Sequence, residues 1–305
     1  MSSISRKATD SAISPVSWSK CRTESMESPQ RVLSALSQCA RHHWTDQANC
    51  RMAWQQWPAS SADATPLLLV HGGFGSWNHW VSNIEALSEH YAVWTLDLPG
   101  LGSSGDLPEP WNTAKISELV LAGWRELHGD KQVFELVGFS FGGLIAGLVA
   151  ASAGSQCARC VLIGASGFGA LHVQAQLLPL PGPELDQAAA EGIHRENLAR
   201  LMLHDPSCID DLAVHIHSNN LKQHRLRSRR MAGSNDLAGV LSQIEAHVVG
   251  IWGQYDATAG GRVNIEARRQ LFLQAQADAE FHELPGVGHW AMYEAPATVN
   301  RLILG

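Results

Sequence analysis

The chain has 305 residues, of which 45% are apolar and 17% charged, with 27 glycines and 13 prolines. This composition is typical of a folded globular protein and excludes a mainly disordered chain. The formal net charge of −7 gives no overall attraction to nucleic acid or to an anionic membrane surface, so neither is expected as a partner.

No apolar segment suits a membrane crossing or a secretion signal. The most apolar stretch, residues 144–151, is well short of the roughly 20 residues that a bilayer crossing requires. Arg6 and Lys7 are not followed by the apolar run of a signal peptide. We therefore expect a cytoplasmic protein with free cysteines. Cys157 and Cys160 have no further ligands at suitable spacing and are predicted to be buried thiols.

Residues 1–30 are rich in serine, lack a periodic apolar pattern, and are predicted to be a disordered tail. A short helix is then expected at 31–39 and an edge strand at 51–57. Further along, short apolar runs alternate with helical patterns. The runs occupy 67–70, 92–96, 133–137, 160–163, 247–252 and 280–284, and the helical patterns 77–90, 113–127, 141–153, 264–275 and 297–305.

Short buried strands that alternate with helices predict an α/β fold, with a mostly parallel sheet and helices on both faces. The alternation stops between 169 and 246, where the chain is rich in Pro, Ala, His and Arg with helical periods. We therefore predict a core formed by 31–168 and 247–305, with 169–246 inserted as a helical cap. No internal repeat is present.

The strongest chemical signal is the sequence G-x-S-x-G formed by Gly138, Ser140 and Gly142. It directly follows the expected strand 133–137 and precedes the small-residue helix 141–153. A nucleophile elbow needs this strand–turn–helix context, because its turn leaves no room for side chains two places from the serine. Ser140 is therefore the predicted nucleophile.

A serine hydroxyl needs a general base, and the base needs an orienting carboxylate. His289 lies in a loop shortly after the last expected strand and is the predicted base. Asp256 lies just after the strand 247–252 and is the predicted carboxylate. The other strand end considered, at Ile163, is followed by 164–167, which contain no acid.

An acyl-transfer site also needs donors for the developing oxyanion. We expect one from the backbone amide of Phe141 and the other from the glycine-rich loop after strand 67–70, where Gly73 is the first choice and Phe74 the second. His71 precedes this turn and is expected to brace it through hydrogen bonds.

The sequence resembles the α/β-hydrolase family over roughly residues 50–303. The resemblance is carried by 71–73, 97–104, the elbow at Ser140, 252–256 and 288–289. It implies a triad of Ser140, Asp256 and His289, a cap between the sixth and seventh strands, and a structural role for Asp97. Within the family the chain looks most similar to the meta-cleavage-product hydrolases, which split carbon–carbon bonds in dienoate acids. Their motifs are matched at 71–73, 205–209 and 289–290.

Several aromatic and basic residues are candidates for substrate binding. Phe74, Phe139 and Trp290 adjoin the predicted catalytic positions. In the cap, Arg225 and Arg229 are four residues apart, so on one helix they would share a face and could clamp a substrate carboxylate. A solvated basic face is the alternative. Histidine pairs such as 215 and 217 lack further ligands, so no metal is expected.

We therefore expect a cofactor-independent serine hydrolase that acts through an acyl-enzyme on a small or medium ester-like or carbonyl substrate, possibly one bearing a carboxylate. Two alternatives stay open: a carbon–carbon bond hydrolase of meta-cleavage products, and a ligand-binding protein of the same fold with little catalysis. An epoxide hydrolase or dehalogenase is excluded, because Ser140 stands where these need a carboxylate. The partner is a small-molecule substrate, and a homo-oligomer is left open.

Overall fold

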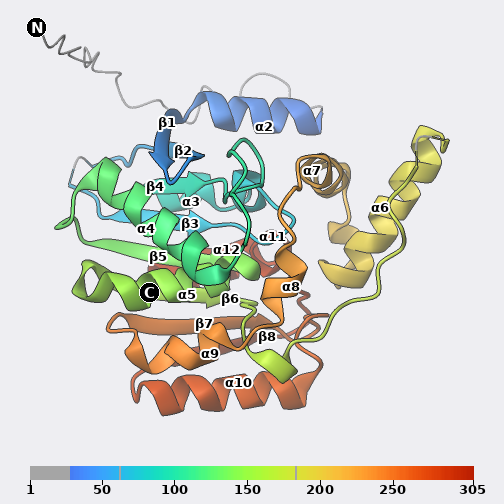
Figure 1. Ribbon diagram of the computed structural model, residues 1–305. Helices are drawn as coiled ribbons and strands as arrows, with labels where there is room; N and C mark the ends of the chain where they lie inside the picture. The colour runs from blue at the N-terminus through green and yellow to red at the C-terminus, as the bar shows by residue number, and fades with distance from the viewer. Residues whose placement is uncertain (1–27, 62, 183) are drawn as a thin grey trace, which may run out of the picture.

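The computed structural model describes residues 28–61, 63–182 and 184–305 (Figure 1). Of the predicted tail, 1–27 lie outside these residues, and α2 already begins at Pro29. The strands are β1 (Arg41–Gln47), β2 (Cys50–Trp57), β3 (Pro66–Val70), β4 (Ala92–Leu96), β5 (Phe134–Phe139), β6 (Cys157–Ile163), β7 (His247–Gly253) and β8 (Glu280–Leu284).

One helix precedes β1, and helices follow each of the strands from β3 to β8. They are α2 (Pro29–Gln38), α3 (Ile84–Ser88), α4 (Thr113–His128), α5 (Phe141–Ala153), α6 (Gln187–Leu201), α7 (Asp211–Lys222), α8 (Ser228–Ala232), α9 (Asp236–Val240), α10 (Arg262–Ala275), α11 (Ala291–Glu294) and α12 (Pro296–Leu304). Short 3-10 turns lie at η1 (Trp77–Trp80), η2 (Gly154–Gln156), η3 (Gly169–Leu171), η4 (Pro206–Cys208) and η5 (Leu241–Gln243).

The eight strands form one sheet in the order β1-β2-β4-β3-β5-β6-β7-β8. The pairs from β4 through β8 are parallel, whereas β2 runs antiparallel to both β1 and β4. The α/β fold with a mostly parallel sheet is therefore confirmed. The expected edge position of strand 51–57 is wrong, because β1 pairs along the outer side of β2. Residues 41–47 alternate only weakly between apolar and polar side chains, so the sequence pattern does not predict a strand there.

Both faces of the sheet are covered by apolar helices, as parallel strands require. Along β3, Leu68 and Val70 pack in a cluster with residues of α4, α5 and α10. Leu67 and Leu69 point to the other face, where they pack with residues of α3 and α12. This double burial explains why β3 is an uninterrupted apolar run. It also holds the carboxyl ends of the strands, and the loops that follow them, in fixed positions.

Helices α6, α7, α8 and α9 all lie between β6 and β7 in the chain, and α6 and α7 stand beside the sheet in Figure 1. A buried pair of amides ties α7 to the core: Asn78 donates to Asn220 at 3.0 Å, and Asn220 donates back at 2.8 Å. Helix α9 instead packs on α5, with Leu237 in the same cluster as Leu144. Within the described ranges, no helix combines the length and apolar character needed to cross a bilayer.

Candidate active site

Ser140 lies at the tight turn between β5 and α5, with a φ of +55° that residues with side chains rarely adopt. Its backbone is fixed on both sides, because its amide donates to Ile163 O at 2.9 Å and its carbonyl accepts from Gly143 N at 3.0 Å. The surrounding structure therefore holds the strained turn in place. The side chain is partly exposed at the start of α5.

The flanking glycines are required by sterics. A Cβ on Gly138 would lie 2.5 Å from the Cβ of Ala146, and one on Gly142 would collide with the carbonyl of His71. Both positions therefore exclude any side chain, which is the physical content of the sequence motif at Ser140.

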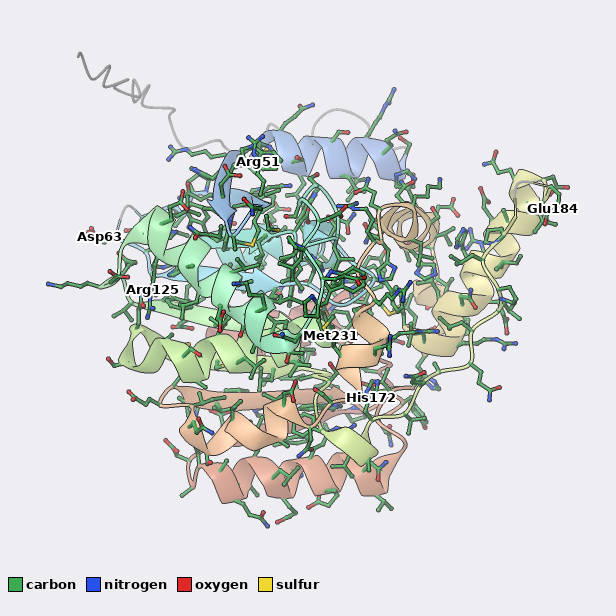
Figure 2. All side chains as sticks on the ribbon, viewed as in Figure 1. Arg51, Asp63, Arg125, His172, Glu184 and Met231 are labelled. Atoms are coloured by element: carbon green, nitrogen blue, oxygen red, sulfur yellow. The ribbon has the colours of Figure 1, made fainter. Side chains whose placement is uncertain are left out.

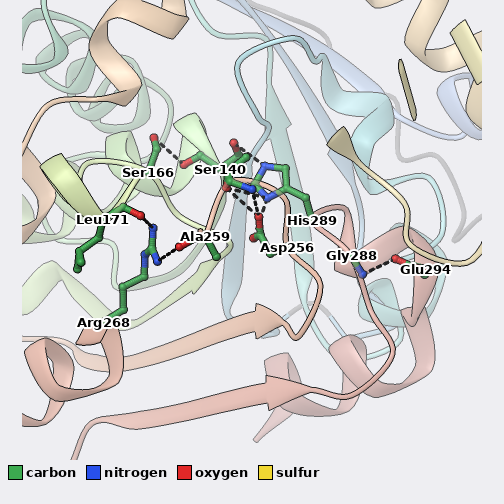
Figure 3. Close-up of polar contacts among 10 residues, drawn as sticks. Ser140, Ser166, Leu171, Asp256, Ala259, Arg268, Gly288, His289 and Glu294 are labelled. Atoms are coloured by element: carbon green, nitrogen blue, oxygen red, sulfur yellow. Dashed lines mark hydrogen bonds and ion pairs between the residues drawn. The ribbon is translucent and has the colours of Figure 1, made fainter. Parts of the chain in front are cut away.

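Ser140, His289 and Asp256 form a continuous hydrogen-bonded chain (Figure 3). His289 Nε2 lies 2.9 Å from Ser140 Oγ, and His289 Nδ1 lies 2.8 Å from Asp256 Oδ2. A carboxylate can only accept, so Nδ1 carries the imidazole proton and Nε2 accepts from the serine hydroxyl. Ser140 follows β5, Asp256 lies in the loop after β7, and His289 lies in the loop after β8. The structure brings all three side chains together.

The Asp256 carboxylate is buried but well supplied with donors. Its Oδ1 accepts from both the amide and the hydroxyl of Thr258, each at 2.8 Å. Burial raises the pKa of Asp256, but the nearby His289 imidazole and the hydrogen bonds from His289 and Thr258 outweigh burial and lower the pKa below its ordinary value. Asp256 is therefore ionised at neutral pH and can orient His289.

The two expected oxyanion donors lie side by side: a Cβ on Gly73 would be 3.2 Å from the Cβ of Phe141. The carbonyl of Gly72 accepts from His71 Nδ1 at 2.8 Å and from Gly75 N at 3.0 Å. Because the peptide unit is planar and trans, this carbonyl sets the opposite direction for the Gly73 N–H. His71 Nε2 in turn accepts from Leu98 N at 2.9 Å, so His71 braces the turn as expected.

Asp97 has the structural environment that the resemblance implies. Its carboxylate accepts from Trp77 N at 2.9 Å and from Ser103 N at 2.8 Å. These hydrogen bonds join the loop after β4 to η1.

A cavity of about 350 Å³ opens next to the oxyanion loop. Phe74, the residue after Gly73, is part of its wall, whereas Ser140 and His289 are not. The remaining wall is mostly apolar and comes from the segment between β6 and β7, where the cap is predicted: Leu177, Leu178, Pro179, Leu180, Asn197, His217, Leu221 and Arg229. The guanidinium of Arg229 lies 5.4 Å from the centre of the Phe74 ring, within the range of a cation–π contact.

The structure corrects the expected arginine clamp. Arg225 lies in the loop between α7 and α8, so it shares no helix face with Arg229. Its guanidinium is held by Asp106 at 2.6 Å and by the carbonyl of Ser104 at 2.5 Å. Arg225 is therefore occupied by the core loop after β4, and only Arg229 lines the cavity.

Two aromatic residues expected to bind substrate are instead packed inside the core. Trp290 is fully buried, donates from Nε1 to His79 O at 3.0 Å and stacks on Tyr293. Phe139 is 1% exposed and packs against the ring of His289. Both support the loop that carries His289, and neither has surface left for a substrate. Of the expected aromatic residues, only Phe74 lines the cavity.

Sequence reasoning missed two residues close to Asp256. Arg268 of α10 is 1% exposed and donates to Ala259 O at 2.9 Å and to Leu171 O at 2.7 Å (Figure 3). His172, labelled in Figure 2, is the next residue in the chain after Leu171. Burial, and then the charges of His289 and Arg268, lower its pKa to about 4. Neither residue belongs to a motif, so only the folded chain reveals them.

The described residues contain no group of three or more His, Cys, Asp or Glu side chains that could hold a metal ion. His217 and His194 pack ring against ring with centroids 5.5 Å apart. His215 Nε2 lies 2.9 Å from the side-chain amide of Asn219.

The family model described as alpha/beta hydrolase fold matches residues 65–196, which run from just before β3 into α6 and include Ser140. Among curated proteins, the dihydrolipoyllysine-residue acetyltransferase component of the acetoin cleaving system of Pseudomonas putida is 31% identical over 79% of this chain. The match spans 62% of the length of that relative. A 2-hydroxy-6-oxononadienedioate/2-hydroxy-6-oxononatrienedioate hydrolase of Paraburkholderia phymatum is 26% identical over 80% of this chain and 88% of its own length.

Solved structures show the same fold at low identity. An esterase from a Rhodococcus species has a TM-score of 0.68 and 17% identity, covering 88% of this chain and 99% of its own. A meta-cleavage product hydrolase from Pseudomonas fluorescens has a TM-score of 0.66 and 19% identity, covering 86% and 96%. Together with the sheet topology, these comparisons show that the chain has the α/β-hydrolase fold. The expected class of an α/β-hydrolase-fold enzyme agrees with these comparisons.

Proposed function

We propose that the protein is a cofactor-independent serine hydrolase that cleaves ester-like substrates through an acyl-enzyme. The observation that carries this proposal is the hydrogen-bonded chain from Ser140 Oγ through His289 to Asp256, with distances of 2.9 and 2.8 Å. A nucleophile, its base and an orienting carboxylate in this order are the parts that acyl transfer needs.

In the first half-reaction, Ser140 Oγ gives its proton to His289 Nε2 and attacks the substrate carbonyl carbon. Negative charge develops on the carbonyl oxygen, which accepts hydrogen bonds from the amides of Gly73 and Phe141. The tetrahedral intermediate collapses as the leaving group takes the proton from Nε2, and the acyl group stays on Ser140. Throughout, ionised Asp256 stabilises the imidazolium of His289.

In the second half-reaction, a water molecule takes the place of the leaving group. It gives one proton to His289 Nε2 and attacks the acyl carbon through the same oxyanion geometry. Collapse returns the proton to Ser140 Oγ and releases the carboxylic acid. No step in this cycle calls for a metal or an organic cofactor.

The cap cavity supports an apolar substrate group. Leu177, Leu178, Leu180, Leu221 and Phe74 dominate its wall, and Phe74 follows the proposed oxyanion donor. We infer that the substrate carries an aliphatic or aromatic group that fills this space. Arg229 supplies a cation in the same wall, so a carboxylate remote from the scissile bond would be favoured there.

A second candidate is hydrolysis of a carbon–carbon bond in a meta-cleavage product. It is favoured by curated relatives named 2-hydroxy-6-oxononadienedioate/2-hydroxy-6-oxononatrienedioate hydrolase, at 24% to 27% identity over about four fifths of this chain. The same serine, histidine and aspartate would serve this reaction. Turnover of aryl esters of graded acyl length, compared with turnover of 2-hydroxy-6-oxo-dienoates, separates the two bond types.

A ligand-binding protein with little catalysis is the remaining alternative. A fluorophosphonate probe tests it, because the probe reacts covalently only with an activated serine. We expect labelling of Ser140 in the wild-type protein, and no labelling in Ser140→Ala. Absence of both labelling and turnover in the folded wild-type protein would favour the binding role.

A further inference from the structure

The cap makes a direct hydrogen bond to the oxyanion loop. Ser228, the first residue of α8, is 2% exposed, and its hydroxyl donates to Gly73 O at 2.9 Å. The contact is close: a Cβ on Gly73 would lie 2.7 Å from Ser228 Oγ. Gly73 thus lies between the cap residue Ser228 and the elbow residue Phe141.

With this bond, the carbonyls of both Gly72 and Gly73 in the oxyanion loop are held by hydrogen bonds. The carbonyl of Gly72 is held from the core side by His71 Nδ1 and Gly75 N. The carbonyl of Gly73 is held from the cap side by Ser228. Since each peptide unit is planar, the first set of bonds fixes the direction of the Gly73 N–H, and the Ser228 bond fixes that of the Phe74 N–H. The peptide units on either side of Gly73 are therefore anchored by different parts of the molecule.

The segment that carries Ser228 is itself anchored on the core. The amides of Arg225 and Leu226 both donate to Gly100 O, at 2.9 and 3.2 Å, and the Leu226 side chain is 1% exposed. The next residue after Ser228 is Arg229, which lines the cap cavity and lies over Phe74. Two neighbours in sequence, 228 and 229, therefore contact two neighbours in sequence, 73 and 74.

We propose that Ser228 is a positioning residue through which the cap sets the geometry of the oxyanion loop for substrates whose apolar group fills the cavity. Such a group presses on Phe74 and Arg229, and the Ser228 bond holds Gly73 in the position needed for the transition state. The effect of filling the cavity then falls on kcat rather than only on KM. This inference rests on the proposed serine hydrolase function.

The test uses the full-length protein with Ser228→Ala, which removes the hydroxyl, and Ser228→Cys, which keeps a similar volume but donates more weakly. Ser218→Ala is the matched control, because its hydroxyl donates to His215 O within α7 at 3.1 Å. Each variant is assayed on aryl acetate, butyrate, hexanoate and octanoate, and its unfolding midpoint is recorded. Hydrogen exchange at the Gly75 amide, which bonds to Gly72 O, reports loop order without any turnover.

In the wild-type protein and in Ser218→Ala, we expect kcat to rise with acyl length until the cavity is filled. In Ser228→Ala, kcat on the best ester should fall about 10-fold, less than the loss of a whole oxyanion donor, with KM within about twofold. The rise of kcat with acyl length should flatten, Ser228→Cys should show the same trend, and Gly75 should exchange faster in both variants.

The proposal is overturned if both folded Ser228 variants keep wild-type kcat on every ester, or if Gly75 exchange is unchanged in both. A wild-type protein that turns over no ester and is not labelled at Ser140 contradicts the proposed function instead. In that case Gly75 exchange still decides whether Ser228 orders the loop.

Discussion

Gly164, at the end of β6, leaves the space in which the Asp256 carboxylate meets His289. A Cβ on Gly164 would lie 2.9 Å from Asp256 Oδ2 and 3.0 Å from His289 Nδ1. The residue also has a φ of +50°, which favours glycine. The end of β6, the strand next to β5, thus leaves open space beside the hydrogen bond between Asp256 and His289.

Gly164→Ala should therefore lower kcat by roughly 10- to 100-fold, because the new methyl group shifts the Asp256–His289 pair from its productive geometry. It should also destabilise the fold by about 1 to 3 kcal/mol through the positive φ. Steady-state kinetics and chemical denaturation measure the two effects.

Gly154→Ala is the matched control. Gly154 has a φ of +55°, but the nearest atom to a Cβ there belongs to Glu245 at 3.6 Å, away from the site. We expect a similar loss of stability with an unchanged kcat. Equal losses of kcat in the two variants would mean that Gly164 acts on stability alone.

Asp256→Asn should slow turnover about 10⁴-fold, because an amide stabilises the wrong tautomer of His289. Asp97→Asn should instead cost about 1 to 3 kcal/mol of stability while kcat changes little, since Asp97 holds the backbones of Trp77 and Ser103. Turnover and unfolding are measured on both variants. A kcat that falls more in Asp97→Asn than in Asp256→Asn would reverse the two assignments.

Arg229→Met should lower the preference for a substrate with a remote carboxylate over its methyl ester by about 10-fold in kcat/KM, because one charge-assisted contact is lost. Arg225→Met should leave that ratio within about twofold, since its guanidinium is held by Asp106 and Ser104 O outside the cavity. A ratio that moves only in Arg225→Met would show that the cavity wall has been misassigned.

Buried His217 should make the fold sensitive to acid. Burial, and then the neighbouring His194, lower the pKa of His217 from 6.5 to about 4. Between these values the unfolded chain binds a proton that the folded protein does not. His217 therefore lowers stability as the pH falls from the unfolded pKa toward the folded one.

Denaturation at about pH 7 and about pH 5 should show a loss of stability to which His217 contributes about 2 kcal/mol. His217→Gln should reduce the loss by that amount, whereas the surface variant His90→Gln serves as the control. An equal pH dependence in wild type and His217→Gln would refute this contribution.

The sequence was sufficient for the parallel sheet and for the grouping of Ser140, His289 and Asp256, because each rests on local signals. Gly138 and Gly142 are needed by the turn itself, and Asp256 and His289 lie in the loops a few residues after β7 and β8. Such local patterns can be detected in the sequence because the backbone geometry restricts which residues fit at neighbouring positions.

The contacts between distant segments were not predictable. The position of Arg225 depends on an ion pair with Asp106, and that of Trp290 on a bond to His79 O. The shared helix expected for Arg225 and Arg229 fails because α7 ends at Lys222 and α8 begins at Ser228. Likewise, nothing in the sequence indicates that Arg268 or Ser228 reaches the loops around the site, since each acts on backbone carbonyls rather than through a motif.

The most direct test of the account is mass spectrometry of the intact protein and its peptides after reaction with a fluorophosphonate. Ser140 should carry the single covalent adduct in the wild-type protein, with a labelling rate that falls by orders of magnitude in His289→Ala and to zero in Ser140→Ala. A folded wild-type protein that stays unlabelled, or that is labelled at another serine with Ser140 free, would contradict the assignment of Ser140 as the nucleophile.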